Sequence, residues 1–413
     1  MRRGGIQLSR RGLALYRLLT RIVLLLVIVG VGFCFSALTQ LPASPLADVA
    51  EQSTLSQATR RLFELVTLGG LISAGIMLAG AELSVERAPW LGRLWTALVI
   101  ASLTLTPFDF AGALELAAAF LALIALAASY RRGETSVFLR VWQIGLLLIA
   151  VSFLGAQPLA GQALDAARAF RIQVAYPIAG LSVMFWLMRR YSRVDDEWLQ
   201  EGLRIVAVLV FLAGGLISLG RLGLPPVIAV GAAALVPLCY MILAGHSYRA
   251  LASRNENATL ATHWIALATL FWLVGGGFLG TLSSQPAINA AMRGTDLAAA
   301  QDWLARWALL AIVLGFVNEA ASTLRGDNQR VTGYTPLWLM VFGVGLAAIT
   351  QAGRGVVEIY LRRVGIVDAE ALRELLLPLT VVWFICLLAV AAGILTYALG
   401  FWLRKPRIIL IDD

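Results

Sequence analysis

Histidine is nearly absent from this chain, because 413 residues contain only two, His246 and His263. Cysteine is also scarce: Cys34, Cys239 and Cys386 all lie inside apolar stretches, and none forms a CxxC pair. Metal centres in proteins usually need several imidazole or thiolate ligands close together. The sequence therefore excludes a centre built on a cluster of histidines or cysteines, and it predicts that the thiols are buried as small apolar groups.

Charged residues are the second shortage, because they make up 14% of the chain while hydrophobic residues make up 60%. Soluble globular chains are about 25% charged and about 45–50% apolar, and the mean hydropathy here is +0.82. Lysine occurs once, at Lys405, so arginine supplies almost all of the net charge of +9. The arginines lie in short runs between apolar stretches, which is typical of membrane topology signals and argues against nucleic-acid binding. Phosphate loops, dinucleotide-binding fingerprints and nucleophile–base pairs are also missing from the sequence.

Long apolar stretches run through the whole sequence, and each can form a helix across about 30 Å of hydrocarbon. They cover roughly 15–39, 60–82, 90–107, 110–130, 138–160, 170–190, 202–220, 225–248, 262–284, 302–323, 335–353 and 375–403. The sequence thus predicts an all-α membrane protein with twelve transmembrane helices in a single polytopic domain over residues 1–413. The first stretch is longer than the apolar core of a signal peptide, so we expect a retained anchor.

Arginine runs between the stretches predict the orientation in the membrane. Even-numbered loops and the segment after the last stretch hold Arg131, Arg132, Arg189, Arg190, Arg193, Arg249, Arg254, Arg325, Arg330, Arg404, Lys405 and Arg407. Odd-numbered loops are longer and carry Asp48, Glu51, Asp165, Asp296, Asp368 and Glu370, although they also contain Arg362 and Arg363. We therefore expect both termini in the cytoplasm and the protein in the inner membrane of a bacterial cell.

Four short stretches occur in a fixed order between about residues 60 and 400. They are Thr59–Glu64 followed by Leu68, Gly69, Gly70 and Gly75; Ser218–Pro226; Gly294–Asp296 with Ala300–Trp303 and Leu309, Leu310 and Gly315; and Leu337–Met340 with Gly343 and Gly345. In this order the chain resembles the catalytic subunit of the heme-copper oxidase superfamily, closest to its nitric oxide reductase and cbb-type oxidase branches. The resemblance implies a core of twelve helices with cytoplasmic ends, which agrees with the predicted topology.

The resemblance also implies where heme and copper ligands would stand, and histidine is found at none of these positions. They hold Phe63 or Glu64 on the second helix, Gln173 to Tyr176 on the sixth, Ser218 to Arg221 on the seventh, and Gln301 or Asp302 with Trp303 on the tenth. Carboxylate, amide and indole groups cannot together replace six imidazoles. We therefore expect no metal and no cofactor, with vacated ligand positions near Glu64, Gln173, Arg221, Asp302 and Trp303.

Charged side chains within predicted helices are costly in lipid and therefore mark candidate sites. They are Glu64, Glu115, Asp302, Arg306 and Glu319, of which Asp302 and Arg306 are spaced for an i, i+4 pair. One interpretation is a polar cavity filled by salt bridges or by a lipid or quinone headgroup. The other is that these groups lie near enough to an interface to reach water.

Two tryptophans and the two histidines are the other side chains that need an interpretation. Trp303 and Trp307 share a helix face, where they either fill the volume that a heme would need or belong to an interfacial aromatic belt. His246 and His263 flank an inner loop, and we interpret them as interfacial residues.

The sequence favours a non-catalytic, metal-free, oxidase-like subunit of a respiratory or electron-transfer membrane complex. Its expected partners are lipid and other membrane subunits, such as a cytochrome-bearing one, and not nucleic acid. A secondary transporter with a 12-helix core and a quinone-interacting membrane subunit are the alternatives, and an enzyme acting on a quinone or lipid through its buried carboxylates stays open. Transporters often have broken helices, and the only mid-span prolines are Pro177 and Pro237, which weakly disfavours that class.

Overall fold

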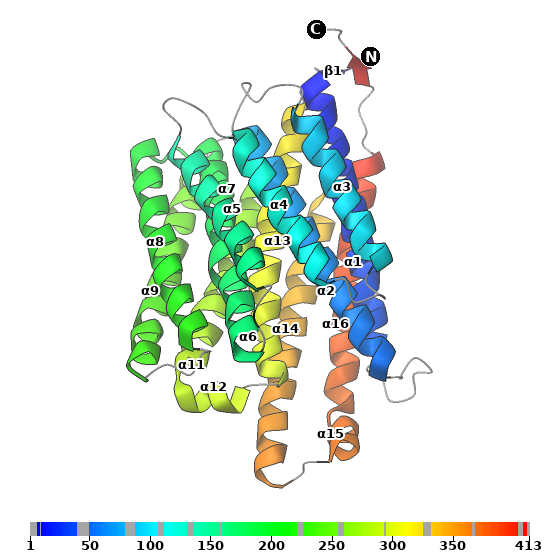
Figure 1. The fold of residues 1–413 in the computed structure, drawn as a ribbon, viewed down its shortest axis with the longest axis vertical. Helices are drawn as coiled ribbons and strands as arrows, with labels where there is room; N and C mark the ends of the chain where they lie inside the picture. The colour runs from blue at the N-terminus through cyan, green and yellow to red at the C-terminus, as the bar shows by residue number, and fades with distance from the viewer. Residues whose placement is uncertain are drawn as a thin grey trace.

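The computed structural model describes residues 6–8, 10–38, 49–78, 87–105, 111–129, 136–156, 159, 161–220, 226–254, 260–292, 295–324, 332–365, 368–403 and 408–410. The described chain is a bundle of long helices whose axes run side by side (Figure 1). Each of the twelve predicted apolar stretches contains a helix, because long apolar segments satisfy their backbone polar groups within one helix.

The first half of the bundle consists of α1 (Arg10–Leu38), α2 (Val49–Leu78), α3 (Arg87–Leu105), α4 (Ala111–Ser129), α5 (Val137–Ala156), α6 (Gly161–Phe170), the π-helix η3 (Arg171–Ala175), α7 (Tyr176–Tyr191) and α8 (Asp196–Gly220). The second half consists of α9 (Pro226–Ala252), α10 (Ala261–Trp272), the π-helix η4 (Leu273–Leu279), α11 (Gly280–Ser284), α12 (Pro286–Met292), α13 (Asp296–Leu324), α14 (Tyr334–Arg363), α15 (Ala369–Leu375) and α16 (Leu377–Leu403).

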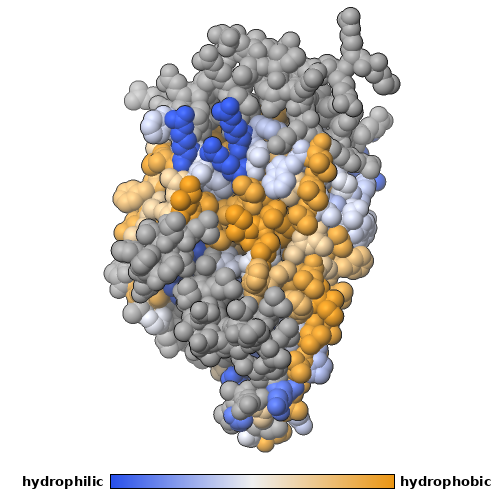
Figure 2. Space-filling view, turned by 90° about the vertical axis from the view of Figure 1, so that its right-hand side faces the viewer, coloured by the Kyte–Doolittle hydropathy of each residue, from blue (hydrophilic) through white to orange (hydrophobic). Residues whose placement is uncertain are grey.

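Ten of these helices, or continuous helix groups, are long and apolar enough to cross a membrane within the described residues. The two remaining predicted spans correspond to α3 and to α4, whose apolar part, Ala113–Ser129, is shorter. Figure 2 shows hydrophobic residues across the middle of one face and hydrophilic residues toward its two ends. The protein is therefore an all-α, multi-pass membrane protein.

The two ends of the chain lie at the same end of the bundle (Figure 1). There the strands β1 (Ile6–Leu8) and β2 (Ile408–Leu410) pair in parallel, with Ile6 opposite Ile408. The opposite end of the bundle is formed by α12, α15 and the far half of α14 (Figure 1). The sequence did not predict the two short strands, because segments of three residues carry no usable periodicity.

Helix α14 runs well past the predicted stretch 335–353 and ends at Arg363. Its 30 residues span about 45 Å, which exceeds the hydrocarbon thickness of about 30 Å. Beyond the apolar part, the helix is supported by polar contacts: Arg354 pairs with Asp296 at 3.0 Å, and Glu358 pairs with Arg362 one turn later. The extension thus continues in a polar environment, which an apolar pattern alone cannot reveal.

The glycine run Gly275–Gly277 lies within η4 and permits close packing there. A Cβ at Gly276 would overlap the ring of Tyr240 on α9, and one at Gly275 would overlap Leu304 on α13. These glycines therefore allow α9 and α13 to approach η4 closely.

Candidate functional site

The candidate site begins at η3, the five-residue π-helical segment between α6 and α7. Pro177 follows it and has no amide hydrogen to donate to the Gln173 carbonyl four residues earlier, so a regular α-helical hydrogen bond is missing here. Gly214 of α8 lies against that carbonyl, because a Cβ at Gly214 would be only 2.7 Å from the Gln173 oxygen. π-helical turns often mark functional sites. This one buries two polar residues, Arg171 and Gln173.

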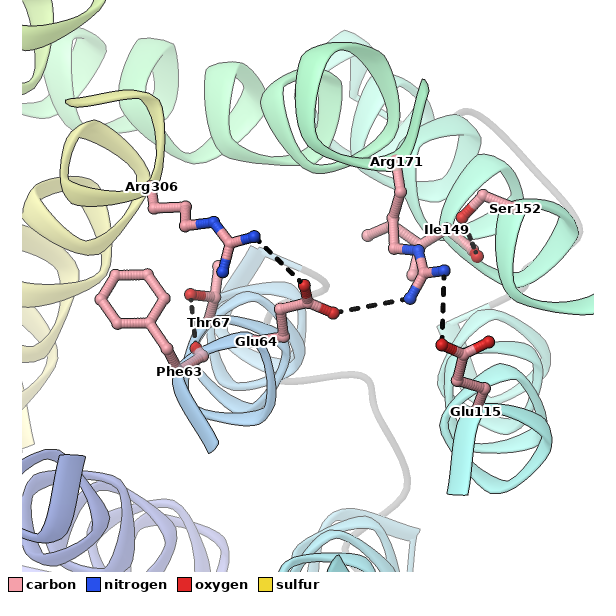
Figure 3. Close-up of polar contacts among 8 residues, drawn as sticks. All are labelled: Phe63, Glu64, Thr67, Glu115, Ile149, Ser152, Arg171 and Arg306. Atoms are coloured by element: carbon pink, nitrogen blue, oxygen red, sulfur yellow. Dashed lines mark hydrogen bonds and ion pairs between the residues drawn. The ribbon is translucent and has the colours of Figure 1, made fainter. Parts of the chain in front are cut away.

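Arg171 is the centre of a chain of four charged side chains from four elements (Figure 3). Its Nη1 lies 3.5 Å from Glu64 Oε2 on α2, and its Nη2 lies 3.9 Å from Glu115 Oε1 on α4. Arg306 on α13 approaches the other oxygen of Glu64, with Nη2 at 3.9 Å from Oε1. The order Arg306–Glu64–Arg171–Glu115 alternates positive and negative charge, so each carboxylate lies beside at least one guanidinium.

Burial makes the charge balance of this network important. The Arg171 side chain is 3% exposed, whereas Glu64 and Glu115 are 24% and 25% exposed. The Arg171 guanidinium carbon also lies 3.8 Å from the centroid of the Phe153 ring, so a cation–π contact covers one of its faces. Removing one partner of such a buried group is expected to destabilise a protein strongly, by about 3–5 kcal/mol.

Three polar groups of the site lack a hydrogen-bond partner among the described residues. They are Nε and Nη2 of Arg171, Nε of Arg306 and the hydroxyl group of Tyr176. Buried polar atoms are nearly always paired, with protein or with water, so unpaired ones need an explanation. A cluster of them around one pocket is expected where a ligand or water completes the site.

A pocket with about 400 Å³ of empty space, partly open to the exterior, lies beside the network. Its charged and polar walls come from Arg61, Glu64, Ser102, Glu115, Arg171 and Tyr176, and its apolar walls from Leu65, Leu98, Leu114, Ala118 and Phe153. The walls contributed by α3, α4 and α5 come from the first turns of α4 and the last turns of α3 and α5, and the other lining residues belong to α2, η3 and α7. The pocket therefore lies in the half of the bundle away from the chain ends.

An aromatic cluster also lies between α2 and α13, two of the four elements that supply the network. Phe63 and Trp307 have ring centroids 5.7 Å apart, and Trp303 and Trp307 are 5.3 Å apart. Phe33 of α1 completes the cluster, 5.2 Å from Trp303 and 6.0 Å from Phe63. Trp303 also donates from Nε1 to the Val344 carbonyl at 3.3 Å. Both tryptophans are buried, so they form part of the protein interior and not an interfacial belt.

A second, smaller pocket has about 240 Å³ of empty space and lies between η3, α8, α9 and η4. Gln173, Gly214, Cys239, Tyr240 and Gly276 are among its lining residues. The Gln173 Nε2 atom is buried and has no hydrogen-bond partner among the described residues. The pocket thus places Gln173, a candidate position of the predicted sixth helix, beside the predicted seventh helix at Gly214, whereas the candidate position Ser218 does not line it.

The predicted charged residues fall into three groups. Glu64, Glu115 and Arg306 meet in the network, where each of the two carboxylates lies beside an arginine. Asp302 is half-buried on α13 and lines neither pocket, and within the described residues it forms no ion pair with Arg306 or any other group. Arg221 lies outside the described residues.

The remaining predicted residues have separate environments. Glu319 is 2% exposed and forms a short ion pair with Arg190. His246 packs against Trp198, with ring centroids 4.0 Å apart, and His263 packs against Tyr334. No group of three or more histidine, cysteine, aspartate or glutamate residues suited to a metal occurs in the described part of the chain. The phenyl, amide and indole groups at Phe63, Gln301 and Trp303 do not fit a heme or copper centre.

Arg171 is the functional residue that the sequence reasoning missed. It stands one residue inside the predicted stretch 170–190, where an arginine is expected to reach the interface. The available signal was Pro177, six residues later, because a mid-span proline predicts an irregular turn in the preceding residues. Neither a family model nor a curated protein matches this chain.

Proposed function

We propose that this membrane protein binds a small amphipathic molecule in the pocket beside the Arg171 network. The observation that carries the proposal is the buried ion network itself, which forms one wall of a partly open pocket whose other walls are mainly apolar. Ligand pockets typically combine apolar walls with a few convergent polar groups. A molecule with an apolar body and a polar head matches this division, and a quinone or a lipid has that form.

Three features support binding rather than a purely structural role for the network. Charged residues at intramembrane depth are costly, and a helix bundle without a use for them is more stable with apolar packing. The carboxylates of Glu64 and Glu115 are partly exposed, so a ligand can reach them. The π-helical turn that presents Arg171 is a local departure from regular structure at the same place.

Filling the pocket tests this proposal. Leu98 is buried and lines the pocket, so Leu98→Trp should fill it, whereas Ile100→Trp on the same helix changes an exposed position. The wild-type protein in neutral detergent should gain thermal stability with a short-chain benzoquinone or a lysophospholipid, because a ligand that binds only the folded state stabilises it. Leu98→Trp should abolish this gain and Ile100→Trp should keep it. Equal gains in both variants would reject the pocket as the site.

A second candidate is the metal-free, oxidase-like subunit of a respiratory or electron-transfer membrane complex. It is supported by the contact of Phe63 with Trp307, which packs against Trp303 in turn, because the family resemblance implies that ligand positions on the second and tenth helices lie near each other.

Co-purification in mild detergent tests this second candidate. A heme-bearing or cytochrome partner in stoichiometric amount would support the complex. Isolation of the chain alone would favour the secondary transporter, which the two π-helical interruptions η3 and η4 also support. A heme bound by the chain itself would contradict the metal-free interpretation.

We propose in addition that twelve helices cross a bacterial inner membrane and that both termini are cytoplasmic. The shared location of the chain ends supports an even number of crossings (Figure 1). Reporter fusions after Arg132, Arg193, Arg254 and Arg330 should then report the cytoplasm. Fusions near Ala163 and Asp296 should report the outside, the side on which the pocket lies. Two reversed loops would reject this topology.

A further inference from the structure

We propose that the ligand of the larger pocket is an anionic amphiphile and that Arg61 selects it by binding its anionic headgroup. This inference rests on the proposed function, because it assumes that the pocket binds an amphiphile, and it adds the charge class of that ligand and the residue that recognises it.

The charge of the pocket points to an anion. The network contains two carboxylates, Glu64 and Glu115, and two guanidiniums, Arg171 and Arg306, which balance one another. Arg61 lines the same pocket as an additional cation, and it forms no ion pair with any described residue. Counted together with Arg306, which contacts Glu64 but does not line the pocket, these described residues carry one positive charge in excess, and an anionic group at Arg61 would neutralise it.

The depth of Arg61 matches that of a headgroup. In the sequence of α2, Arg61 stands between the polar stretch that ends at Arg60 and the apolar residues from Leu62 onward, which is where a membrane boundary is expected. One turn further along the helix, Glu64 and Leu65 line the pocket at greater depth, and Leu98 and Leu114 face them from α3 and α4. An anionic group at Arg61 would thus remain near the interface while the attached apolar chain lies against the leucines.

The two carboxylates of the network also restrict where in the pocket an anionic headgroup can bind. Deeper in the pocket the charge of Arg171 is already offset by Glu64 and Glu115, so the position at Arg61, which forms no ion pair with a described residue, suits a negative headgroup best. Guanidinium binds both phosphate and carboxylate oxygens in a fork geometry. The same site therefore accepts the phosphate of a phospholipid or the carboxylate of a fatty acid, and experiment must distinguish these two sources.

The test compares three ligands by native mass spectrometry of the full-length protein in neutral detergent: lysophosphatidylglycerol, lysophosphatidylcholine and palmitate. We expect the wild-type protein to bind at least one of the anionic ligands about tenfold more tightly than the zwitterionic lipid, as for one charged hydrogen bond. Arg61→Gln should reduce this preference to about one. The matched control is Arg168→Gln, which changes an exposed arginine of α6 that does not line the pocket and should keep the preference.

Each outcome separates the inference from the proposed function. Preference for lysophosphatidylglycerol identifies a phosphate headgroup, and preference for palmitate identifies a carboxylate. Equal binding of all three ligands, lost in Leu98→Trp, would overturn the role of Arg61 and leave amphiphile binding intact. Equal loss of preference in Arg61→Gln and Arg168→Gln would also overturn it, because general surface charge would then be responsible. Binding unaffected by Leu98→Trp would reject the pocket and with it the proposed function.

Discussion

Helices α2 and α13 face each other with two very different surfaces, one aromatic and one ionic. Phe63 and Trp307 meet on the first surface, and their immediate neighbours in sequence, Glu64 and Arg306, meet on the second. Successive residues of an α-helix point about 100° apart, so one helix pair can carry both surfaces side by side. The same two helices therefore supply both surfaces, and the position of a residue along each helix decides whether it joins the aromatic or the ionic one.

The two surfaces are held together by different forces. The aromatic cluster needs only close packing and favourable ring geometry, with Phe63, Trp303 and Trp307 buried and Phe33 partly buried. The ionic surface depends on charge balance, because every carboxylate and guanidinium removed from water must be compensated nearby. The aromatic surface is thus suited to stability and the ionic surface to recognition, and substitutions on the two surfaces should behave differently.

The largest effect is expected for Arg171→Leu, which leaves Glu64 and Glu115 without their shared partner. We expect the free energy of unfolding to fall by about 3–5 kcal/mol, as measured by denaturant titration in detergent micelles. Adding Glu64→Gln and Glu115→Gln should restore much of the loss by removing the two carboxylate charges that Arg171 offsets. The control Arg189→Leu removes an exposed pair with Asp196 and should cost less than about 1 kcal/mol. Similar losses in both arginine variants would contradict a central role for Arg171.

The next largest effect is expected for Trp307→Ala, which removes a buried indole from the aromatic cluster. We expect the free energy of unfolding to fall by about 3 kcal/mol, as for other large-to-small substitutions in a packed interior. A double-mutant cycle with Phe63→Ala should give a coupling energy of at least about 0.5 kcal/mol, because the two rings touch. The cycle of Trp307→Ala with Glu64→Gln should be additive. Strong coupling in this second cycle would mean that the two surfaces are not independent.

A smaller effect is expected for Arg306→Leu, because Glu64 keeps its contact with Arg171. We expect the free energy of unfolding to fall by about 1–2 kcal/mol. Thermal unfolding in the same detergent measures this change. Arg204 is exposed on α8 and serves as the control, since Arg204→Leu should change stability by no more than about 0.5 kcal/mol. A larger loss than in Arg171→Leu would make Arg306, and not Arg171, the main partner of Glu64.

The smallest effect is expected for Tyr176→Phe, which removes a buried hydroxyl group without a hydrogen-bond partner among the described residues. In ligand-free protein the melting temperature should stay the same or rise slightly, by the equivalent of at most about 1 kcal/mol. Tyr16→Phe, in which the changed tyrosine stacks on Phe401 far from the pocket, provides a comparison. A clear loss of stability in Tyr176→Phe alone would indicate that the hydroxyl group binds water or ligand in the pocket.

Local patterns in the sequence determined the helical architecture. Apolar runs of about 20 residues can only satisfy their backbone in lipid as helices, so each of the twelve predicted stretches contains one. The charged positions Glu64 and Arg306 could be selected from sequence because a charge within an apolar run is unusual. The pairing of Asp302 with Arg306, expected from i, i+4 spacing, does not occur among the described residues, because Arg306 lies beside Glu64 of another helix.

What the tertiary structure alone decided is which charges meet. Glu64 and Arg171 are separated by 107 residues, and no periodicity within one helix can state that η3 and α2 are neighbours. The same holds for Phe63 and Trp307, whose contact depends on how α2 and α13 are rotated about their axes. Sequence fixes the face on which a side chain lies relative to its own helix, because the helical repeat is constant. The partner of that face is set by packing among all the helices, and this is why the pocket could be recognised only in three dimensions.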